Sequence, residues 1–173
     1  MIDIMKTYYS KTYLILICFA LLIAAISCSK DDTTNEDDIE KEERLTVADE
    51  ILQIVNDHRL SIGENTLETN TLATNLANEH TEYMIAQNDI SHDDFNQRSD
   101  RLIDEENATR TGENVAYGQR SASAVMEAWL NSSGHRKNIE GDFTHIGIGV
   151  IKNDAGVYYF TQIFLKKRPD NNA

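Results

Sequence analysis

Cysteine and proline are nearly absent from this chain. Its 173 residues include two Cys and one Pro, and Cys18 and Cys28 both lie close to the N-terminus. Once that N-terminal segment is set aside, the fold has to be stable without disulfides. A hydrophobic content of 40% supplies a core of ordinary size, and the length fits one globular domain plus a short extra segment.

Basic residues are also scarce. The chain has 16 Lys and Arg against 29 Asp and Glu, which gives a formal net charge of −13. Residues 1–28 contain two basic residues and one acidic residue, so the chain without them has a net charge of −14. Nucleic acid is excluded as a partner, because phosphate binding needs clustered Lys and Arg. The acidic surface that this charge predicts favours solubility and attracts cations.

The one long apolar run lies at the N-terminus. It extends from Tyr13 to Ile26, follows two lysines, and has the length of a signal-peptide hydrophobic region, short for a membrane span. The run ends at Ala25-Ile26-Ser27-Cys28, which resembles the lipobox of bacterial lipoproteins. This resemblance predicts that residues 1–28 are a lipoprotein signal peptide and that lipidated Cys28 attaches the protein to a membrane. An uncleaved anchor and a plain secretory signal are the alternatives.

Residues 29–44 are polar and acidic and contain no aromatic residue, so they predict a disordered tether. Their first residues, Ser29-Lys30-Asp31-Asp32, resemble the export signal that sends some lipoproteins to the outer face of the outer membrane. A solvated spacer without such a signal is the alternative. We expect a lipid-anchored protein at the outer membrane, with the face of the membrane left open.

Three helices are expected in the domain that follows, residues 45–168. Thr46 to Asp49 has the form of a capping box, and apolar residues then recur at helical spacing to about Leu60. A second helix is expected over 69–87, where His80 shares the apolar stripe and is interpreted as a packed core residue. Ser121 caps a third helix over 122–130.

The remaining segments predict strands and a long loop. Residues 146–152 and 157–165 alternate in the manner of strands, and the turn at 153–156 joins them as an antiparallel hairpin. Residues 111–118 predict a short strand or turn. Residues 88–110 predict a polar loop with one short helix near 95–103.

The candidates for chemistry are polar residues in turns: His92, Glu113 with the adjacent Asn114, and His135. Two imidazoles and a carboxylate suit a divalent ion such as zinc, and the same groups without a metal suit acid and base roles. Glu113 capping backbone amides and His135 interacting with a helix terminus are the structural alternatives. Spacing alone does not show that these residues meet.

The order of the motifs along the chain resembles the CAP superfamily, also called the SCP domain, in its bacterial secreted branch. The segments that carry this resemblance are Asn56-x-x-Arg59, His80-Thr81-Glu82-Tyr83-Met84, Ser91-His92, Gly112-Glu113-Asn114-Val115-Ala116-x-Gly118, Trp129-x-Asn131-Ser132-x-Gly134-His135-Arg136-x-Asn138-Ile139 and Phe143-x-x-Ile146-Gly147-Ile148-Gly149. The resemblance implies an α+β fold, a three-layer α-β-α sandwich with a mostly antiparallel central sheet. Asn56 and Arg59 are interpreted as structural residues at the end of the first helix.

The resemblance also implies a central cavity lined by His and Glu. His92, Glu113 and His135 match three of its four metal-binding positions. The fourth, expected to be a Glu, is Ser132 here, which lowers the negative charge offered to a cation. Zinc is the metal expected from this donor set.

Two functional hypotheses follow. The first is a lipid-anchored binding domain, expected to be a monomer, whose cavity holds a divalent metal or a small ligand from the cell envelope or surface. The second is a metal-dependent hydrolase of peptides or envelope polymers, with Glu113 as general base. No Gly-x-Ser-x-Gly elbow is present, and the sequence does not decide whether the protein is an enzyme.

Overall fold

The structure is a computed structural model that describes the main chain of residues 36–169 and the side chains from residue 47 onward. The predicted signal peptide, the lipidation site Cys28 and the first part of the tether lie outside the described residues. Within the described part, every helix is too short or too polar to cross a membrane.

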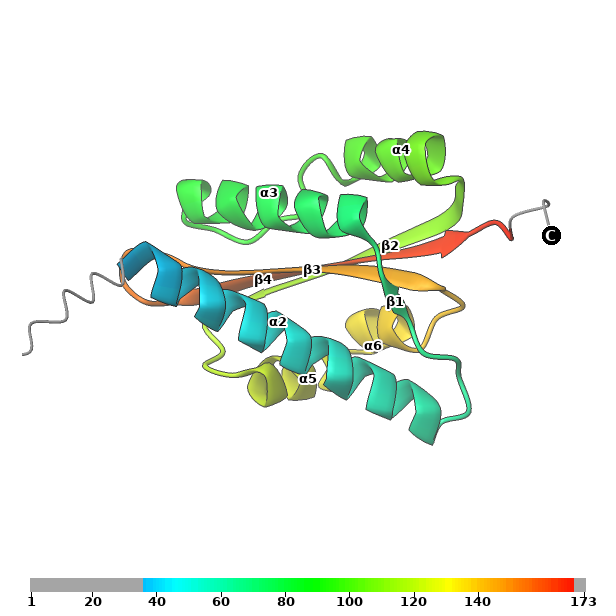
Figure 1. Cartoon of the computed structure of the whole chain (residues 1–173), viewed down its shortest axis with the longest axis horizontal. Helices are drawn as coiled ribbons and strands as arrows, with labels where there is room; N and C mark the ends of the chain where they lie inside the picture. The colour runs from blue at the N-terminus through cyan, green and yellow to red at the C-terminus, as the bar shows by residue number, and fades with distance from the viewer. Residues whose placement is uncertain (1–35, 170–173) are drawn as a thin grey trace, which may run out of the picture. The chain divides into compact units, whose positions relative to one another are not determined.

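Five helices and four strands make up the described part of the domain. In chain order they are α2 (Glu36–Ser61), β1 (Glu68–Thr69), α3 (Thr71–Gln87), α4 (Phe95–Glu106), β2 (Ala108–Tyr117), α5 (Ala122–Asn131), α6 (Ser133–Ile139), β3 (His145–Lys152) and β4 (Tyr158–Lys167). Helices α3 and α4 lie on one side of the sheet, and α2, α5 and α6 lie on the other (Figure 1). This arrangement confirms the predicted α+β fold with three layers.

The sheet has the strand order β1-β3-β4-β2. Strand β4 pairs antiparallel with both β3 and β2, whereas β1 pairs parallel with β3. The sheet is therefore mixed, because the short β1 adds one parallel pairing to two antiparallel ones. The predicted β3–β4 hairpin is confirmed, with its turn at Asn153 to Gly156.

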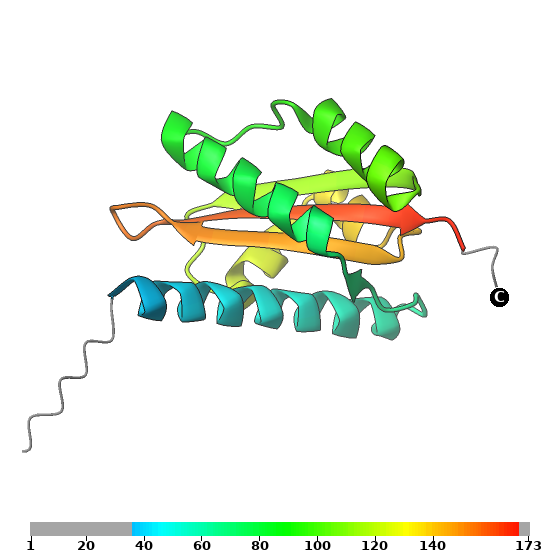
Figure 2. The same ribbon diagram turned by 45° about the horizontal axis from the view of Figure 1, so that its top comes forward.

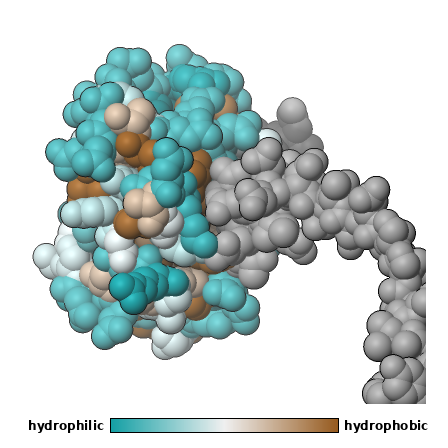
Figure 3. All heavy atoms as spheres, turned by 90° about the vertical axis from the view of Figure 1, so that its left-hand side faces the viewer, coloured by the Kyte–Doolittle hydropathy of each residue, from teal (hydrophilic) through white to brown (hydrophobic). Residues whose placement is uncertain are grey.

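Apolar side chains fill the space on both sides of the sheet. Trp129, Phe160 and Val55 belong to the larger cluster, which packs α2 and α5 against the sheet. Leu76 and Leu102 belong to the cluster between α3, α4 and the opposite face. On the molecular face that Figure 3 shows, hydrophobic side chains are scattered among hydrophilic ones. The two buried clusters account for the layered fold, because each face of the sheet covers its own core.

Glycines in β3 allow α3 to lie directly on the sheet. A Cβ atom at Gly147 would lie 2.1 Å from the carbonyl carbon of Ala73, and one at Gly149 would lie 2.6 Å from that of Ala77. The side chains of Ile148 and Val150, the alternate residues of β3, belong to the cluster on the opposite face. In the Gly-x-Gly pattern of this strand, the glycines thus allow α3 to approach one face closely, and the residues that alternate with them pack into the core on the other face.

The first helix begins earlier than the capping box predicts. Helix α2 starts at Glu36 and so includes residues 36–44, which the sequence assigns to the tether. The segment Ile39 to Leu45 is rich in Glu, Lys and Arg, which are good helix formers. Thr46 therefore lies inside the helix and does not cap it.

Two other segments are more regular than expected. Helix α4 extends to Glu106 and β2 begins directly after it at Ala108, so the expected loop is short. Residues 133–139, expected as a turn, form the short helix α6 after a break at Ser132.

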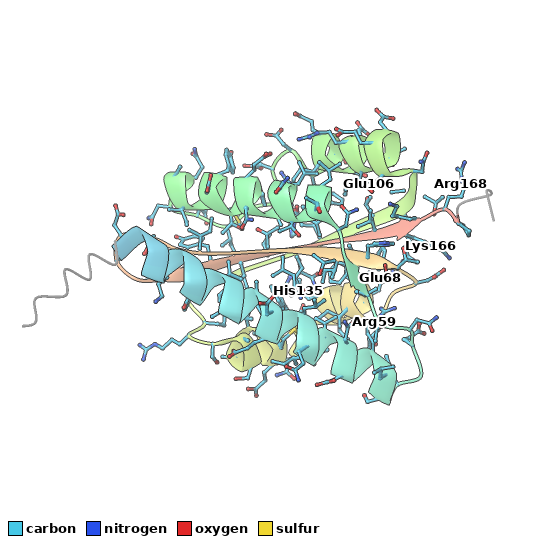
Figure 4. All side chains as sticks on the ribbon, in the orientation of Figure 1. Arg59, Glu68, Glu106, His135, Lys166 and Arg168 are labelled. Atoms are coloured by element: carbon cyan, nitrogen blue, oxygen red, sulfur yellow. The ribbon has the colours of Figure 1, made fainter. Side chains whose placement is uncertain are left out.

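Asn56 and Arg59 anchor the end of α2, as predicted. Arg59 is 1% exposed, and its Nη1 donates to the carbonyl oxygens of Ile139 at 2.7 Å and Gly141 at 2.8 Å. Asn56 exchanges two hydrogen bonds with the main chain of Leu67. Burial lowers the pKa of Arg59. The arginine therefore joins α2 to the segment that follows α6, and Figure 4 shows it reaching from α2 toward α6.

Candidate functional site

Glu113 is the centre of a buried polar cluster on β2. Its side chain is 1% exposed. Arg98 of α4 binds the carboxylate with two hydrogen bonds, from Nε to Oε2 at 2.9 Å and from Nη2 to Oε1 at 3.0 Å. The planar guanidinium matches the spacing of the two carboxylate oxygens, so the pair is geometrically specific. The buried negative charge of Glu113 is thus balanced by a residue of the protein itself.

His92 adds a third hydrogen bond to Glu113. It lies in the loop between α3 and α4, with Nδ1 2.8 Å from Oε1 of Glu113 and a side chain that is 53% exposed. A carboxylate only accepts hydrogen bonds, so Nδ1 carries the proton of this hydrogen bond and Nε2 is the nitrogen left for other partners. No hydrogen bond from the described residues uses Nε2. Glu113 fixes the tautomer and the orientation of this ring.

His80 supports the same cluster from α3. Its Nε2 lies 2.7 Å from the carbonyl oxygen of Ser91 and 3.9 Å from Oε1 of Glu113. Burial lowers its pKa, so the ring is neutral and Nε2 carries the proton that it donates to the carbonyl. His80 is a packed, hydrogen-bonded core residue, as predicted. It also holds the main chain directly before His92.

His135 lies on α6, on the side of the sheet opposite α3 and α4 (Figure 4). Its side chain is half-buried. Burial lowers the pKa of His135 first, and the charge of His92 lowers it further. The charge of His92 thus disfavours protonation of His135.

Asn114 connects β2 to α6. Its Nδ2 donates to the carbonyl oxygen of His135 at 3.2 Å and to Oε1 of Gln162 at 3.1 Å. Nδ2 of Asn138 donates to Oδ1 of Asn114 at 2.9 Å and to the main-chain oxygen of Glu113 at 3.0 Å. This buried amide network fixes the main chain at His135 relative to Glu113.

Ser132 separates α5 from α6. Its main-chain N–H donates to the carbonyl oxygen of Trp129 at 3.1 Å, and its side chain makes no capping hydrogen bond to α6. The side chain is half-buried. A neutral hydroxyl therefore occupies the position at which the family resemblance leads us to expect a fourth ligand, a carboxylate.

Arg98 is the site residue that sequence reasoning missed. It lies on the inward face of α4 with Phe95 and Leu102, at spacings of three and four residues, and it is 8% exposed. A basic residue at an apolar helical position was the available signal. Its Nη1 also donates to the carbonyl oxygen of Asp93 at 2.7 Å, so it braces the loop that carries His92.

The three residues predicted to bind metal do not all fit that role. Both carboxylate oxygens of Glu113 accept hydrogen bonds from Arg98, and Oε1 also pairs with His92. In the part of the chain with described side chains, no group of three His, Cys, Asp or Glu residues is placed to hold a metal ion. His92 and His135 fit as donors of imidazole nitrogen. Glu113 fits as the carboxylate that orients the His92 ring, an arrangement common behind metal-binding histidines.

Comparison with known proteins identifies the family. The model of the cysteine-rich secretory protein family, CAP, matches residues 52–164. The chain belongs to the CAP family. The matched region extends from the last turns of α2 into β4 and includes His92, Glu113 and His135.

Two relatives of this CAP domain come from Bacillus subtilis. YlbC, named as an uncharacterized membrane protein, is 34% identical over 131 residues, covering 73% of this chain and 36% of YlbC. YkwD is 47% identical over 57 residues, which cover 32% of this chain and 21% of YkwD. The chain thus spans about a third or less of the length of these relatives.

Solved structures show the same CAP fold. An extracellular protein of Bacillus anthracis that contains a SCP domain matches with a TM-score of 0.67 at 28% identity, over 77% of this chain and 44% of that protein. An outer surface protein of Borrelia burgdorferi matches with a TM-score of 0.62 at 24% identity, over 68% of this chain and 90% of that protein. At 24% identity, the match to the Borrelia burgdorferi protein shows a shared fold alone.

Proposed function

We propose that this CAP-domain protein is an extracytoplasmic, lipid-anchored binding protein in which His92 and His135 bind a divalent cation or a small polar ligand. The observation that carries the proposal is the hydrogen-bonded series from Arg98 through Glu113 to His92. That series leaves Nε2 of an oriented, half-exposed imidazole available. His135, with its lowered pKa, supplies a second neutral imidazole.

Location is supported by the N-terminal sequence and by one relative. The run from Tyr13 to Ile26 ends at a Cys preceded by small residues. The Bacillus anthracis protein, 28% identical, is extracellular. The outer membrane is the expected membrane, because the acidic residues after Cys28 resemble an export signal.

Zinc remains the metal that we propose. Neutral imidazole is a good ligand for it, and two histidines with an uncharged Ser132 nearby would leave positions open for water or a ligand oxygen. A bound cation would supply a positive charge that polarises such an oxygen. Glu113 would orient His92, and Arg98 would keep Glu113 in place.

Metal content tests the binding part of the proposal. After dialysis against zinc, we expect about one ion per chain in the wild type and none in a His92→Ala/His135→Ala double variant. His58→Ala is the matched control, because His58 pairs with Glu140 outside this cluster and its loss should leave the content unchanged. Equal zinc in the wild type and the double variant, or zinc in neither, would refute a metal role.

Glu113→Gln separates an orienting role from a ligand role. If Glu113 only orients His92, the variant should bind zinc about 10- to 100-fold more weakly and still reach the same content at saturation. Complete loss of zinc from a variant that circular dichroism shows to be folded would make Glu113 a ligand and contradict the proposal.

Membrane fractionation tests the anchor. Cys28→Ser should move the protein from the detergent-soluble membrane fraction to the soluble or unprocessed fraction, and Cys18→Ser should change nothing. Protease treatment of intact cells then distinguishes the outer face of the membrane from the inner one. Membrane retention of mature Cys28→Ser protein would exclude lipidation at this residue.

Hydrolysis is the second candidate, favoured by the His92–Glu113 pair. A carboxylate-oriented imidazole with a free Nε2 is a common arrangement for a general base. The ion pair with Arg98 moves that role from Glu113, the base expected from the sequence, to His92. In a screen of peptides and envelope glycans, turnover should be abolished by His92→Ala and only reduced by Glu113→Gln. Turnover retained in His92→Ala would rule out this assignment.

A further inference from the structure

A groove runs along the β3 edge of the sheet, between α2 and α3. Its volume is about 320 Å³, within the range of about 300–1,000 Å³ typical of ligand pockets. Ile146, Ile148 and Val150 of β3 line it, and both helices contribute walls. Figure 2 shows β3 at the sheet edge between these helices. Neither His92 nor His135 lines the groove, so it is separate from the site described above.

Strand β1 covers only the start of this edge. It pairs with β3 at His145 and Ile146, and the chain then turns into α3. The N–H of Asn70 donates to the carbonyl oxygen of Ile146 at 2.9 Å, so the main-chain groups of Ile146 point away from β4. Because these groups alternate along a strand, those of Ile148 and Val150 point in the same direction, toward the groove.

The main-chain groups of Ile148 and Val150 that point toward the groove have no partner among the described residues. Ile148 is 8% exposed and Val150 is 2% exposed, so protein covers most of both residues. Buried N–H and C=O groups are almost always hydrogen-bonded. An extended chain offers such partners at the spacing that a strand edge requires.

The other edge of the sheet is closed by side chains. The carbonyl oxygen of Glu113 on β2 accepts from Nδ2 of Asn138 at 3.0 Å, and that of Val115 accepts from Nε1 of Trp129 at 3.2 Å. These contacts occupy the positions to which a further strand would bind. Of the two sheet edges, the one at β3 is therefore the edge able to accept a strand.

Charge indicates the chemistry of the occupant. Asp49 on α2 and Glu82 on α3 line the groove and are exposed, and no Lys or Arg is among its described lining residues. Basic side chains would be attracted on both walls. Adjacent side chains of a strand point to opposite faces of the sheet, so two neighbouring basic residues would reach the two walls, and the apolar floor suits aliphatic residues on either side of them. A second copy of this chain, with a net charge of −13, would be repelled.

We propose that this groove binds an extended, basic peptide segment of another protein, which adds to β3 as a strand and places Lys or Arg side chains beside Asp49 and Glu82. The bound segment lies beside β3 where β1 would continue if the chain did not turn into α3. This mode combines main-chain hydrogen bonds for affinity with side-chain contacts for selectivity.

The probe is the capped hexapeptide Val-Val-Lys-Lys-Val-Val, whose adjacent lysines point to opposite faces of a strand, added to ¹⁵N-labelled protein of residues 29–173. We expect the amide signals of Ile148 and Val150 to shift on binding. A peptide N-methylated at alternate residues keeps its charge but loses its main-chain donors, and a glutamate–valine peptide keeps the donors but reverses the charge. Each should bind at least about tenfold more weakly.

Paired variants test the charges of the groove. Asp49→Asn/Glu82→Gln should weaken binding by about tenfold, because two exposed ion pairs with the peptide are lost and each contributes modestly. Asp57→Asn/Glu79→Gln removes the same charge from the same helices outside the groove and should bind as the wild type does. Ala48→Phe, which narrows the groove from α2, should abolish binding while the protein remains folded.

Four results would overturn the proposal. The first is that the signals of Ile148 and Val150 do not move. The second is that the N-methylated peptide binds as tightly as the unmodified one. The third is that both paired variants weaken binding equally, which would make the attraction a property of the whole surface. The fourth is that the same signals shift with protein concentration alone, because the occupant would then be a second copy.

Discussion

Arg98 is the residue on which the candidate site depends most strongly. Its guanidinium is the basic group that pairs with the buried carboxylate of Glu113, and its second Nη atom supports the main chain at Asp93. Removing one partner of a buried ion pair leaves an uncompensated charge, whereas removing both does not. Removing one partner of the pair therefore lowers the free energy of unfolding by more than the intact pair contributes to it.

Arg98→Met should lower the free energy of unfolding by about 3–5 kcal/mol, because Glu113 would be left buried and unpaired. Arg101→Met is the control on the same helix. Arg101 is exposed and pairs with Glu105, so its loss should change the free energy of unfolding very little. Urea unfolding measures both. The double variant Arg98→Met/Glu113→Leu should be more stable than Arg98→Met alone, and a further loss in the double variant would contradict this account.

His80 gives the stability of the domain a dependence on pH. Burial lowers its folded-state pKa below the ordinary value of 6.5, so below pH 6.5 the unfolded chain binds a proton that the folded chain does not. This contribution to stability is complete above pH 6.5 and is lost as the pH falls toward the folded-state pKa.

The comparison with His80→Gln isolates this residue, because Gln retains an N–H donor for Ser91 and does not titrate. The free energy of unfolding should fall less steeply between pH 7 and pH 5 in the variant than in the wild type. Parallel curves would show that His80 does not titrate differently in the folded and unfolded states.

At this scale the sequence identified the candidate site residues but not their pairing. His92, Glu113 and His135 are polar residues in segments that the sequence predicts as turns or short strands, and they match the family order. Arg98 lies among many charged residues of a polar segment, and its burial depends on a carboxylate that folding brings from another element. The helical spacing of Arg98 with Leu102 was a signal of its burial, but nothing local in the sequence identified Glu113 as its partner.

Among the elements, β3 shows how a strand can be specified by its glycines. Residues Gly147 and Gly149 face α3, and a methyl group at either position would overlap the main chain of that helix. The distance between helix and sheet is thus set by the absence of side chains.

Gly147→Ala should destabilise the domain by about 3 kcal/mol, because the backbone of α3 has to move to make room. Gly134→Ala is the matched control. Gly134 lies within α6, and nothing lies within 4 Å of the position of its Cβ atom, so the change should be neutral or stabilising by up to about 1 kcal/mol. Thermal unfolding of both variants measures their stability. A similar loss of stability in the two variants would exclude the close packing of α3 on Gly147 as the cause.

Long periodic elements were the predictable ones. The patterns over 69–87 and 122–130 predicted α3 and α5 closely, and the Ser121 cap is confirmed by the hydrogen bond that its side chain accepts from the N–H of Ala124. Strand β1 has two residues, too few for any period, and it exists because β3 offers an edge beside it. Helix α6 has few apolar residues and is held by the contacts of Asn138 and Arg59.

For the molecule as a whole, the dominant physical property is its negative charge. Few Lys or Arg residues offset the carboxylates, and the protein without residues 1–28 carries −14. Like charges repel more strongly in the compact state than in the unfolded chain. Salt screens this repulsion, while the buried Arg98–Glu113 pair is affected less.

The melting temperature of residues 29–173 should therefore rise when NaCl is increased from 0.02 M to 0.2 M at pH 7. Equal ionic strengths of KCl and NaCl should give the same increase if screening is the cause. A fall in the melting temperature would mean that attractive surface ion pairs outweigh the repulsion.

The strand order has a consequence for when the domain can fold. Strand β4 is the last described strand along the chain, yet it lies between β3 and β2. Strand β2, residues 108–117, pairs with no other described strand until residues 158–167 are available. Assembly of the sheet therefore waits for a distant segment and is slow relative to helix formation. If a chain with this topology were threaded through a membrane from its N-terminus, the sheet could not close until nearly the whole domain had passed.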